Sequence, residues 1–177
     1  ALTLPTAYAM LGAGWLIMKT WDALQAKAIR WARALLWPMG AALVGISLAS
    51  PWVSPTVFNK WFVLPQFFAL LPIPLSCAVA FLAAWHVLNR PRLLEAGYGW
   101  LVFATTVVLF IMAFFGLAYS LYPNLVVNRI DIWQAASAPE SLMVILVGAV
   151  VVLPMIITYT IFAYRVFWGK AKELTYY

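Results

Sequence analysis

The sequence predicts an all-α protein, a polytopic membrane bundle of about five transmembrane helices. Composition carries this prediction, because 66% of the 177 residues are apolar and only 9% are charged. Mean hydropathy is +0.95. Soluble domains are typically about 45–50% apolar and about 25% charged, so a soluble globular domain is excluded. Disorder is excluded as well, since disordered chains are poor in apolar residues.

Five apolar runs are long enough to be membrane spans, each needing about 20 residues to cross about 30 Å of hydrocarbon. Charged residues fall between the runs or at their ends. Prolines are expected to break the third run near Pro72 and Pro74 and the fifth at Pro154, because proline lacks a backbone donor. We expect residues 1–177 to form one membrane module. The runs are 2–18, 34–50, 65–88, 98–121 and 138–167.

Basic residues divide unevenly between the two faces that five spans create. One face carries Lys19, Lys27, Arg30, Arg33, Arg90, Arg92, Arg165, Lys170 and Lys172. The other face carries only Lys60 and Arg129. An excess of Lys and Arg marks the cytoplasmic side, so a cytoplasmic C-terminus is predicted, with Ala1 outside. Tryptophans near the predicted boundaries indicate an interfacial belt, which we favour over an aromatic ligand cage.

Local patterns predict three features of the connections. Segment 19–33 alternates apolar and basic residues at helical spacing, as in a helix that lies on the inner membrane surface. Ser137-Ala138-Pro139-Glu140 has the form of a capping box, with Ser137 as the N-cap of the fifth span. A related pattern, Asp131-Ile132-Trp133-Gln134, predicts a short interfacial helix over 132–136. An ordinary polar loop is the alternative.

Catalytic chemistry has few candidate residues. One cysteine and one histidine exclude an internal disulfide, a Cys-rich metal site and bis-His haem ligation within the chain. All five acidic residues are predicted outside the hydrocarbon. His86 near the inner end of the third run is either a proton relay or metal ligand, or an interfacial histidine bonded to a carbonyl or water, which we favour. Cys77 is interpreted as a packing residue. We therefore predict no catalytic residue, no metal site and no haem ligand here.

Uncharged polar residues lie within the runs. Thr160 and Tyr164 form an i, i+4 pair that could bond across helices or meet a quinone headgroup. Together with Trp133 they are the candidate quinone or lipid contacts. Threonine can instead bond its own helix backbone, and we favour this for the chain's intramembrane threonines. Small residues that permit close helix approach are Gly12, Gly14, Ala41 and Gly45.

Two stretches resemble subunit II of the cytochrome bd-type quinol oxidases. Their resemblance is to the cyanide-insensitive branch of that family. The first is Tyr8-Ala9-Met10-Leu11-Gly12-Ala13-Gly14-Trp15-Leu16-Ile17-Met18-Lys19-Thr20, followed by Asp22, Leu24 and Gln25. The second comprises Tyr122-Pro123-Asn124, Ile132-Trp133-Gln134-Ala135-Ala136, Ala138-Pro139, Ser141, Val147-Gly148-Ala149, Leu153-Pro154, Tyr159-Thr160 and Tyr164-Arg165-Val166-Phe167-Trp168-Gly169-Lys170. The resemblance covers the C-terminal half of such a subunit.

The resemblance implies an accessory subunit of a respiratory oxidase in the bacterial inner membrane. Haems b and d would belong to a partner, subunit I, and the complex would oxidise quinol and reduce O₂ to water with protons from the cytoplasm. A structural quinone, phospholipid and a small accessory subunit are further implied partners; nucleic acid is not. Family members often show Glu-Gly after Lys-Thr, where this chain has Trp21-Asp22-Ala23. They often show a Pro-Pro pair where it has Val127-Asn128.

Two other functions remain open on the residues alone. The chain could be half of a secondary transporter whose helices are broken at the prolines. Transporters usually place an ionisable residue in the membrane, and none is predicted here. A membrane scaffold without a redox partner is the other alternative.

Overall fold

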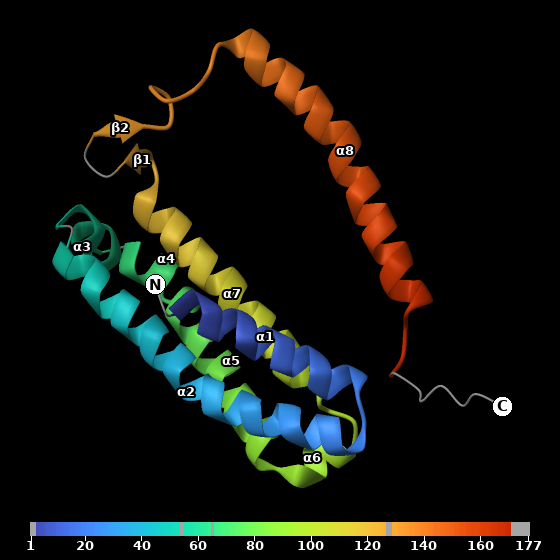
Figure 1. Ribbon diagram of the computed structural model, residues 1–177. Helices are drawn as coiled ribbons and strands as arrows, with labels where there is room; N and C mark the ends of the chain where they lie inside the picture. Colours follow the sequence, from blue (N-terminus) through green and yellow to red (C-terminus); the bar gives the residue numbers. More distant parts are fainter. Residues whose placement is uncertain (1–2, 54, 65, 127–128, 171–177) are drawn as a thin grey trace. The chain divides into compact units, whose positions relative to one another are not determined.

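The computed structural model describes residues 3–53, 55–64, 66–126 and 129–170, and within them the chain is almost entirely helical. Ala1, Val127, Asn128, Lys172 and Glu173 lie outside the described residues. The elements are α1 (Thr3–Lys19), α2 (Asp22–Val53), α3 (Pro55–Phe62), α4 (Gln66–Leu70), α5 (Pro72–Asn89), α6 (Pro91–Glu95), α7 (Trp100–Leu121), β1 (Asn124–Val126), β2 (Ile130–Asp131) and α8 (Pro139–Val166) (Figure 1). The all-α prediction is confirmed.

Four of these helices are long and apolar enough to cross a membrane: α2, α5, α7 and α8. The predicted fourth and fifth runs coincide with α7 and α8 to within two residues at each end. Helix α1 has 17 residues and is therefore about 26 Å long, at the lower limit for a span. The first run, at α1, thus stays a predicted span.

Helix α2 corrects the prediction of a separate surface helix over 19–33. The segment is helical from Asp22 on, but it continues into the span without a break. The buried residues Ala28, Ala32, Leu36 and Met39 recur at helical spacing across the predicted boundary. One continuous packing face therefore joins the basic segment to the apolar one, and this face explains why the helix is not interrupted.

Prolines act differently in the two helices where breaks were predicted. Leu71 separates α4 from α5 just before Pro72 and Pro74, although its own dihedral angles are helical (φ −52°, ψ −33°). Helix α8 runs through Pro154 uninterrupted, so the break predicted there is wrong. Two prolines within one turn remove two backbone donors, whereas a single proline leaves the flanking turns intact.

The chain divides into two compact units, one comprising α1 to α7 up to Ser120 together with Lys170, and the other residues 121–169. Figure 1 shows α1, α2, α5 and α7 lying alongside one another in the first unit. Their shared core is made of Met10, Ala13 and Ile17 from α1, Ala28, Ala32, Leu36 and Met39 from α2, Ala80, Ala84, Val87 and Leu88 from α5, and Val102 and Leu109 from α7. The many alanines allow the helix backbones to come close together.

Two glycines within helices lie at close contacts with a neighbouring helix. A Cβ at Gly14 would lie 3.1 Å from the Cα of Phe103, so α1 and α7 approach backbone to backbone. A Cβ at Gly40 would meet the Phe81 ring of α5. Gly12 and Gly45 have nothing within 4 Å of a Cβ, so of the predicted close-approach glycines only Gly14 is confirmed.

The second unit contains a short antiparallel hairpin, β1–β2, that precedes α8. The predicted short helix over 132–136 is wrong: the chain makes a single turn there, in which the Asp131 carboxylate accepts a hydrogen bond of 2.6 Å from the backbone N–H of Gln134. The capping box is also wrong. Helix α8 starts at Pro139, so the N-cap is Ala138, whose side chain has no oxygen to cap. Proline forces the preceding residue into an extended conformation, here ψ 143°, and places the N-cap directly before it.

Candidate functional site

Thr160 and Tyr164 lie on one face of α8, as their i, i+4 spacing predicts. With Ile161, Arg165 and Trp168 they line a shallow hollow on the surface near the C-terminal end of this helix. The hollow combines apolar walls, two hydroxyl groups and one guanidinium. Such a surface suits an amphipathic ring or headgroup.

Trp133 does not join this pair. It is 75% exposed and lies before the start of α8, whereas Tyr164 is 25 residues after Pro139. Those residues of helix span about 38 Å. One quinone headgroup therefore cannot touch Trp133 and Tyr164 together.

The threonines of α7 bond their own backbone. Thr105 Oγ1 donates to the Leu101 carbonyl, and buried Thr106 donates to the Val102 carbonyl, each at 2.7 Å. These bonds confirm the interpretation favoured from the sequence. They also leave no hydroxyl proton of Thr105 or Thr106 for a partner across the helix interface.

His86 lies in the last turn of α5 and is exposed. The acidic residues that the structure describes lie at helix ends or outside the helices: Asp22, Glu95, Asp131 and Glu140. Within the described residues no group of three His, Cys, Asp or Glu side chains could hold a metal ion. Cys77 is half-buried on α5, where it packs against the core as interpreted.

Arg33 makes a contact that sequence reasoning missed. Its Nε and Nη2 both donate to the Leu88 carbonyl, at 2.9 and 2.5 Å. Leu88 lies in the last turn of α5, where backbone carbonyls have no partner within the helix. Arg33 of α2 therefore caps α5 and lies favourably at the negative end of its dipole.

The opposite end of the first unit has a polar link of its own. Trp61 Nε1 of α3 donates to Ser120 Oγ of α7 at 2.9 Å, and Ser120 donates to the Gly116 carbonyl. The Trp61 and Tyr119 rings meet edge to face. Trp61 was interpreted as one of the interfacial tryptophans, but nothing in the sequence indicated its hydrogen bond to another helix.

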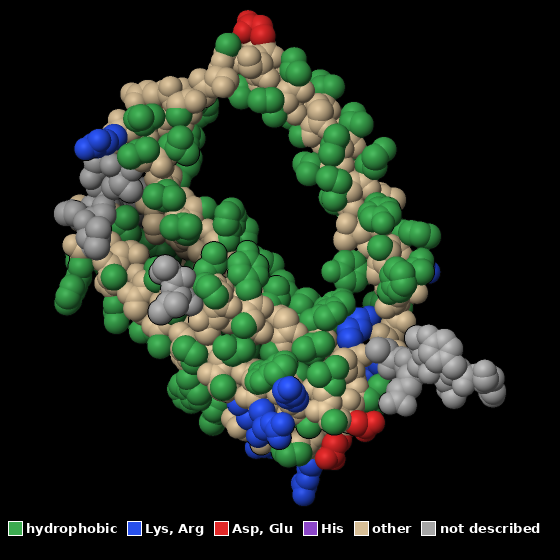
Figure 2. Space-filling view, viewed as in Figure 1, with side chains coloured by type: hydrophobic (Ala, Val, Ile, Leu, Met, Phe, Trp, Pro, Cys, Tyr) green, Lys and Arg blue, Asp and Glu red, His purple; other side chains and the backbone are tan. Residues whose placement is uncertain are grey.

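Basic side chains gather at one end of the first unit, around α6 (Figure 2). Lys19 ends α1, while Lys27, Arg30 and Arg33 lie in the first turns of α2. Arg90 and Arg92 follow at the C-terminal end of α5. Lys60 belongs to α3, which packs beside the far end of α2. The basic residues of this unit therefore divide between its ends as the sequence predicted.

These observations define a helical membrane protein with apolar spans and basic residues concentrated at one end. Its family follows from comparison with known proteins: the family model for cytochrome bd terminal oxidase subunit II matches residues 1–167, so the chain belongs to that family. No curated protein matches the sequence. The family belongs to a quinol oxidase complex, an oxidoreductase of the bacterial inner membrane with a subunit I partner.

Proposed function

We propose that this chain is the haem-free accessory subunit of a bd-type terminal oxidase. It supports a haem-bearing subunit I, which oxidises two quinols for each O₂ reduced to two waters. The single observation that carries the proposal is the family match over residues 1–167. Haems b and d belong to the partner in this proposal, and a catalytic role for this chain's own side chains is not part of it.

The placement of ionisable residues supports an accessory role. A b-type haem needs axial ligands, usually His or Met. The one histidine, His86, is exposed in the last turn of α5. In this proposal the haems, and with them O₂ reduction, are assigned to the partner.

Orientation is the second part of the proposal: the basic end of the first unit faces the cytoplasm, and so does the C-terminus. The uneven distribution of Lys and Arg supports it. The check is to replace Lys27 and Lys60 one at a time by Cys in a functional background. Intact cells are then treated with an impermeant thiol reagent. We expect labelling at position 60 alone. Labelling at position 27 alone would show that the orientation is the opposite of the proposed one.

For the α8 hollow we propose a quinone or lipid that contacts Thr160 and Tyr164. The two hydroxyls, the apolar wall and Arg165 support such an occupant. Trp133, which lies before the start of α8, would contact lipid headgroups separately. Thr160→Val with Tyr164→Phe removes both hydroxyls and keeps the apolar wall. We expect less quinone or lipid to co-purify with this double variant. An unchanged content of quinone and lipid would contradict the proposed site.

The functional proposal is tested by quinol-dependent O₂ uptake. Membranes from cells without this gene are compared with membranes in which the gene is restored, each with the subunit I gene intact. We expect O₂ uptake and the haem d absorption band to be lost together and restored together. Full O₂ uptake without this chain would contradict the supporting role.

A further inference from the structure

Helices α2 and α5 pack antiparallel along a line of contact, here called the seam. Two contacts set the register of the two helices along it. Arg33 bonds the Leu88 carbonyl, and Gly40 touches the Phe81 ring. Because the two helices run in opposite directions, residue numbers rise on α2 as they fall on α5. The two contacts therefore fix which residues of α2 and α5 lie opposite each other. Trp37 and Trp85 come to nearly the same level, about 6 Å from Arg33 along the helix axis.

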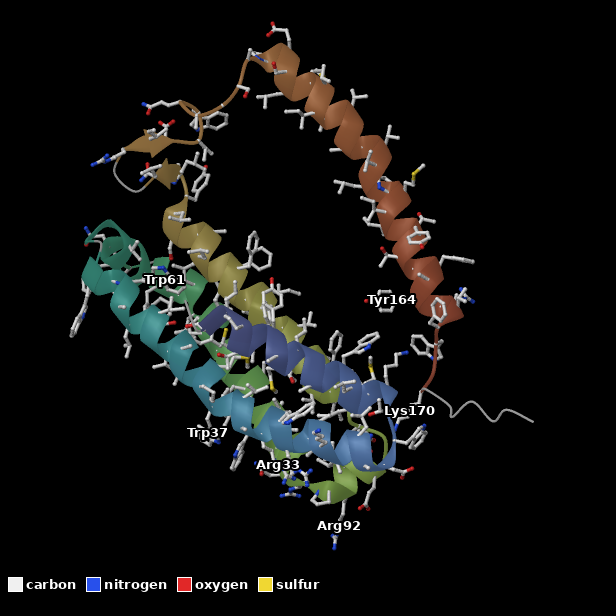
Figure 3. The ribbon with its side chains drawn as sticks, in the orientation of Figure 1. Arg33, Trp37, Trp61, Arg92, Tyr164 and Lys170 are labelled. Carbon is white, nitrogen blue, oxygen red and sulfur yellow. The ribbon has the colours of Figure 1, made fainter. Side chains whose placement is uncertain are left out.

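Both tryptophans face outward from the seam. Trp37 is 62% exposed and Trp85 is 43% exposed, although the Trp37 ring also packs edge to face on Phe81 at 5.9 Å. Figure 3 shows Arg33 and Trp37 one after the other along α2, with Arg92 beyond them. Amphipathic indole rings one turn inside a basic end are typical of the depth at which lipid headgroups join their acyl chains.

Three further arginines belong to the same end of the seam. Arg30 is one turn before Arg33 on α2, and Arg90 and Arg92 follow Leu88 directly. All three are exposed, and within the described residues none of their side chains forms an ion pair or a hydrogen bond. Glu95 and Asp22 are the acids at this end, and neither pairs with these arginines in the described chain.

We propose that this seam binds one anionic phospholipid of the cytoplasmic leaflet. Its phosphate lies among Arg30, Arg90 and Arg92, and its acyl chains lie against Trp37 and Trp85. Charge decides the class of lipid: three guanidiniums without partners favour a net negative headgroup over a zwitterionic one. Arg33 takes a different role, because two of its donors already hold the Leu88 carbonyl. The lipid site rests on the seam alone, and only its assignment to the cytoplasmic leaflet rests on the proposed orientation.

The test is native mass spectrometry of the detergent-purified complex titrated with dioleoyl phosphatidylglycerol, and separately with dioleoyl phosphatidylethanolamine. The variant is Arg30→Gln with Arg92→Gln, which leaves Arg33 and the α5 cap intact. The matched control is Lys19→Gln with Lys27→Gln, which removes the same charge from the same end. Thermal melting of both variants verifies that the fold is kept.

We expect phosphatidylglycerol binding to fall about 30-fold in the arginine variant, from the usual contribution of two basic residues near anionic lipid. The lysine control should lose less than about threefold, because the Lys19 and Lys27 ammonium groups lie over the Trp15 and Trp31 rings and not at the seam. Phosphatidylethanolamine binding should be equal in all forms. An equal loss of phosphatidylglycerol binding in both variants would overturn the proposal of a specific site. Loss of subunit I from the arginine variant would overturn it too, because these residues would then contact protein.

Discussion

Gly14 is the position where a single methyl group should weaken the bundle most clearly. An added Cβ would lie 3.1 Å from the Phe103 Cα and 3.2 Å from its backbone nitrogen. Neither atom can rotate away, so α1 and α7 must separate by a few tenths of an ångström, and overpacking of this kind typically costs about 1–3 kcal/mol. Alanine is favoured over glycine in a helix by about 1 kcal/mol, which offsets part of that cost.

Gly12 is the matched control on the same helix, since a Cβ there meets nothing within 4 Å. Gly12→Ala should gain the helix propensity without any clash. We therefore expect Gly14→Ala to be about 1–3 kcal/mol less stable than Gly12→Ala. The assay is thermal retention of the assembled complex in detergent, followed by size-exclusion chromatography. A Gly14→Ala complex as stable as the Gly12→Ala complex would refute the close approach of α1 and α7.

Four further predictions follow from single contacts. Arg33→Met should lower the melting temperature more than Arg33→Lys, with a loss of about 1–3 kcal/mol, because methionine leaves the Leu88 carbonyl unbonded. Asp22 has φ 50°, so Asp22→Gly should raise the melting temperature and Asp22→Val should lower it by about 1–2 kcal/mol. Ser137→Ala should leave amide exchange in the first turn of α8 unchanged, whereas Ala138→Asp should slow it by capping the helix. His86→Ala should leave the reduced-minus-oxidised haem spectrum of the complex intact, and loss of a haem band at normal subunit yield would contradict this.

The long spans were predictable because their signal is local. Runs 98–121 and 138–167 are long and predominantly apolar, and the helices end close to where the runs end. The N-cap of α8 was predictable as well. Pro139 requires the N-cap to be the residue before it, and this is a stronger constraint than the spacing of Ser137 and Glu140. Strands of three and two residues are too short to carry any periodic signal, so the β1–β2 hairpin was missed.

Contacts between helices were not predictable from one sequence. Gly12 and Gly14 look alike in the sequence, yet only Gly14 meets another backbone. Arg33 counted simply as one positive charge on the cytoplasmic side, whereas its hydrogen bonds join residues 55 apart. Of the candidate site, the i, i+4 geometry of Thr160 and Tyr164 was predictable because it is local to one helix. Their separation from Trp133 required the length of α8.

The central claim is that this chain works beside a haem-bearing oxidase subunit. It is tested most directly by purifying the protein from its native membrane and recording a reduced-minus-oxidised spectrum of what comes with it. We predict b- and d-type haem bands carried by a co-purifying partner polypeptide. A colourless preparation that contains only copies of this chain would contradict the account.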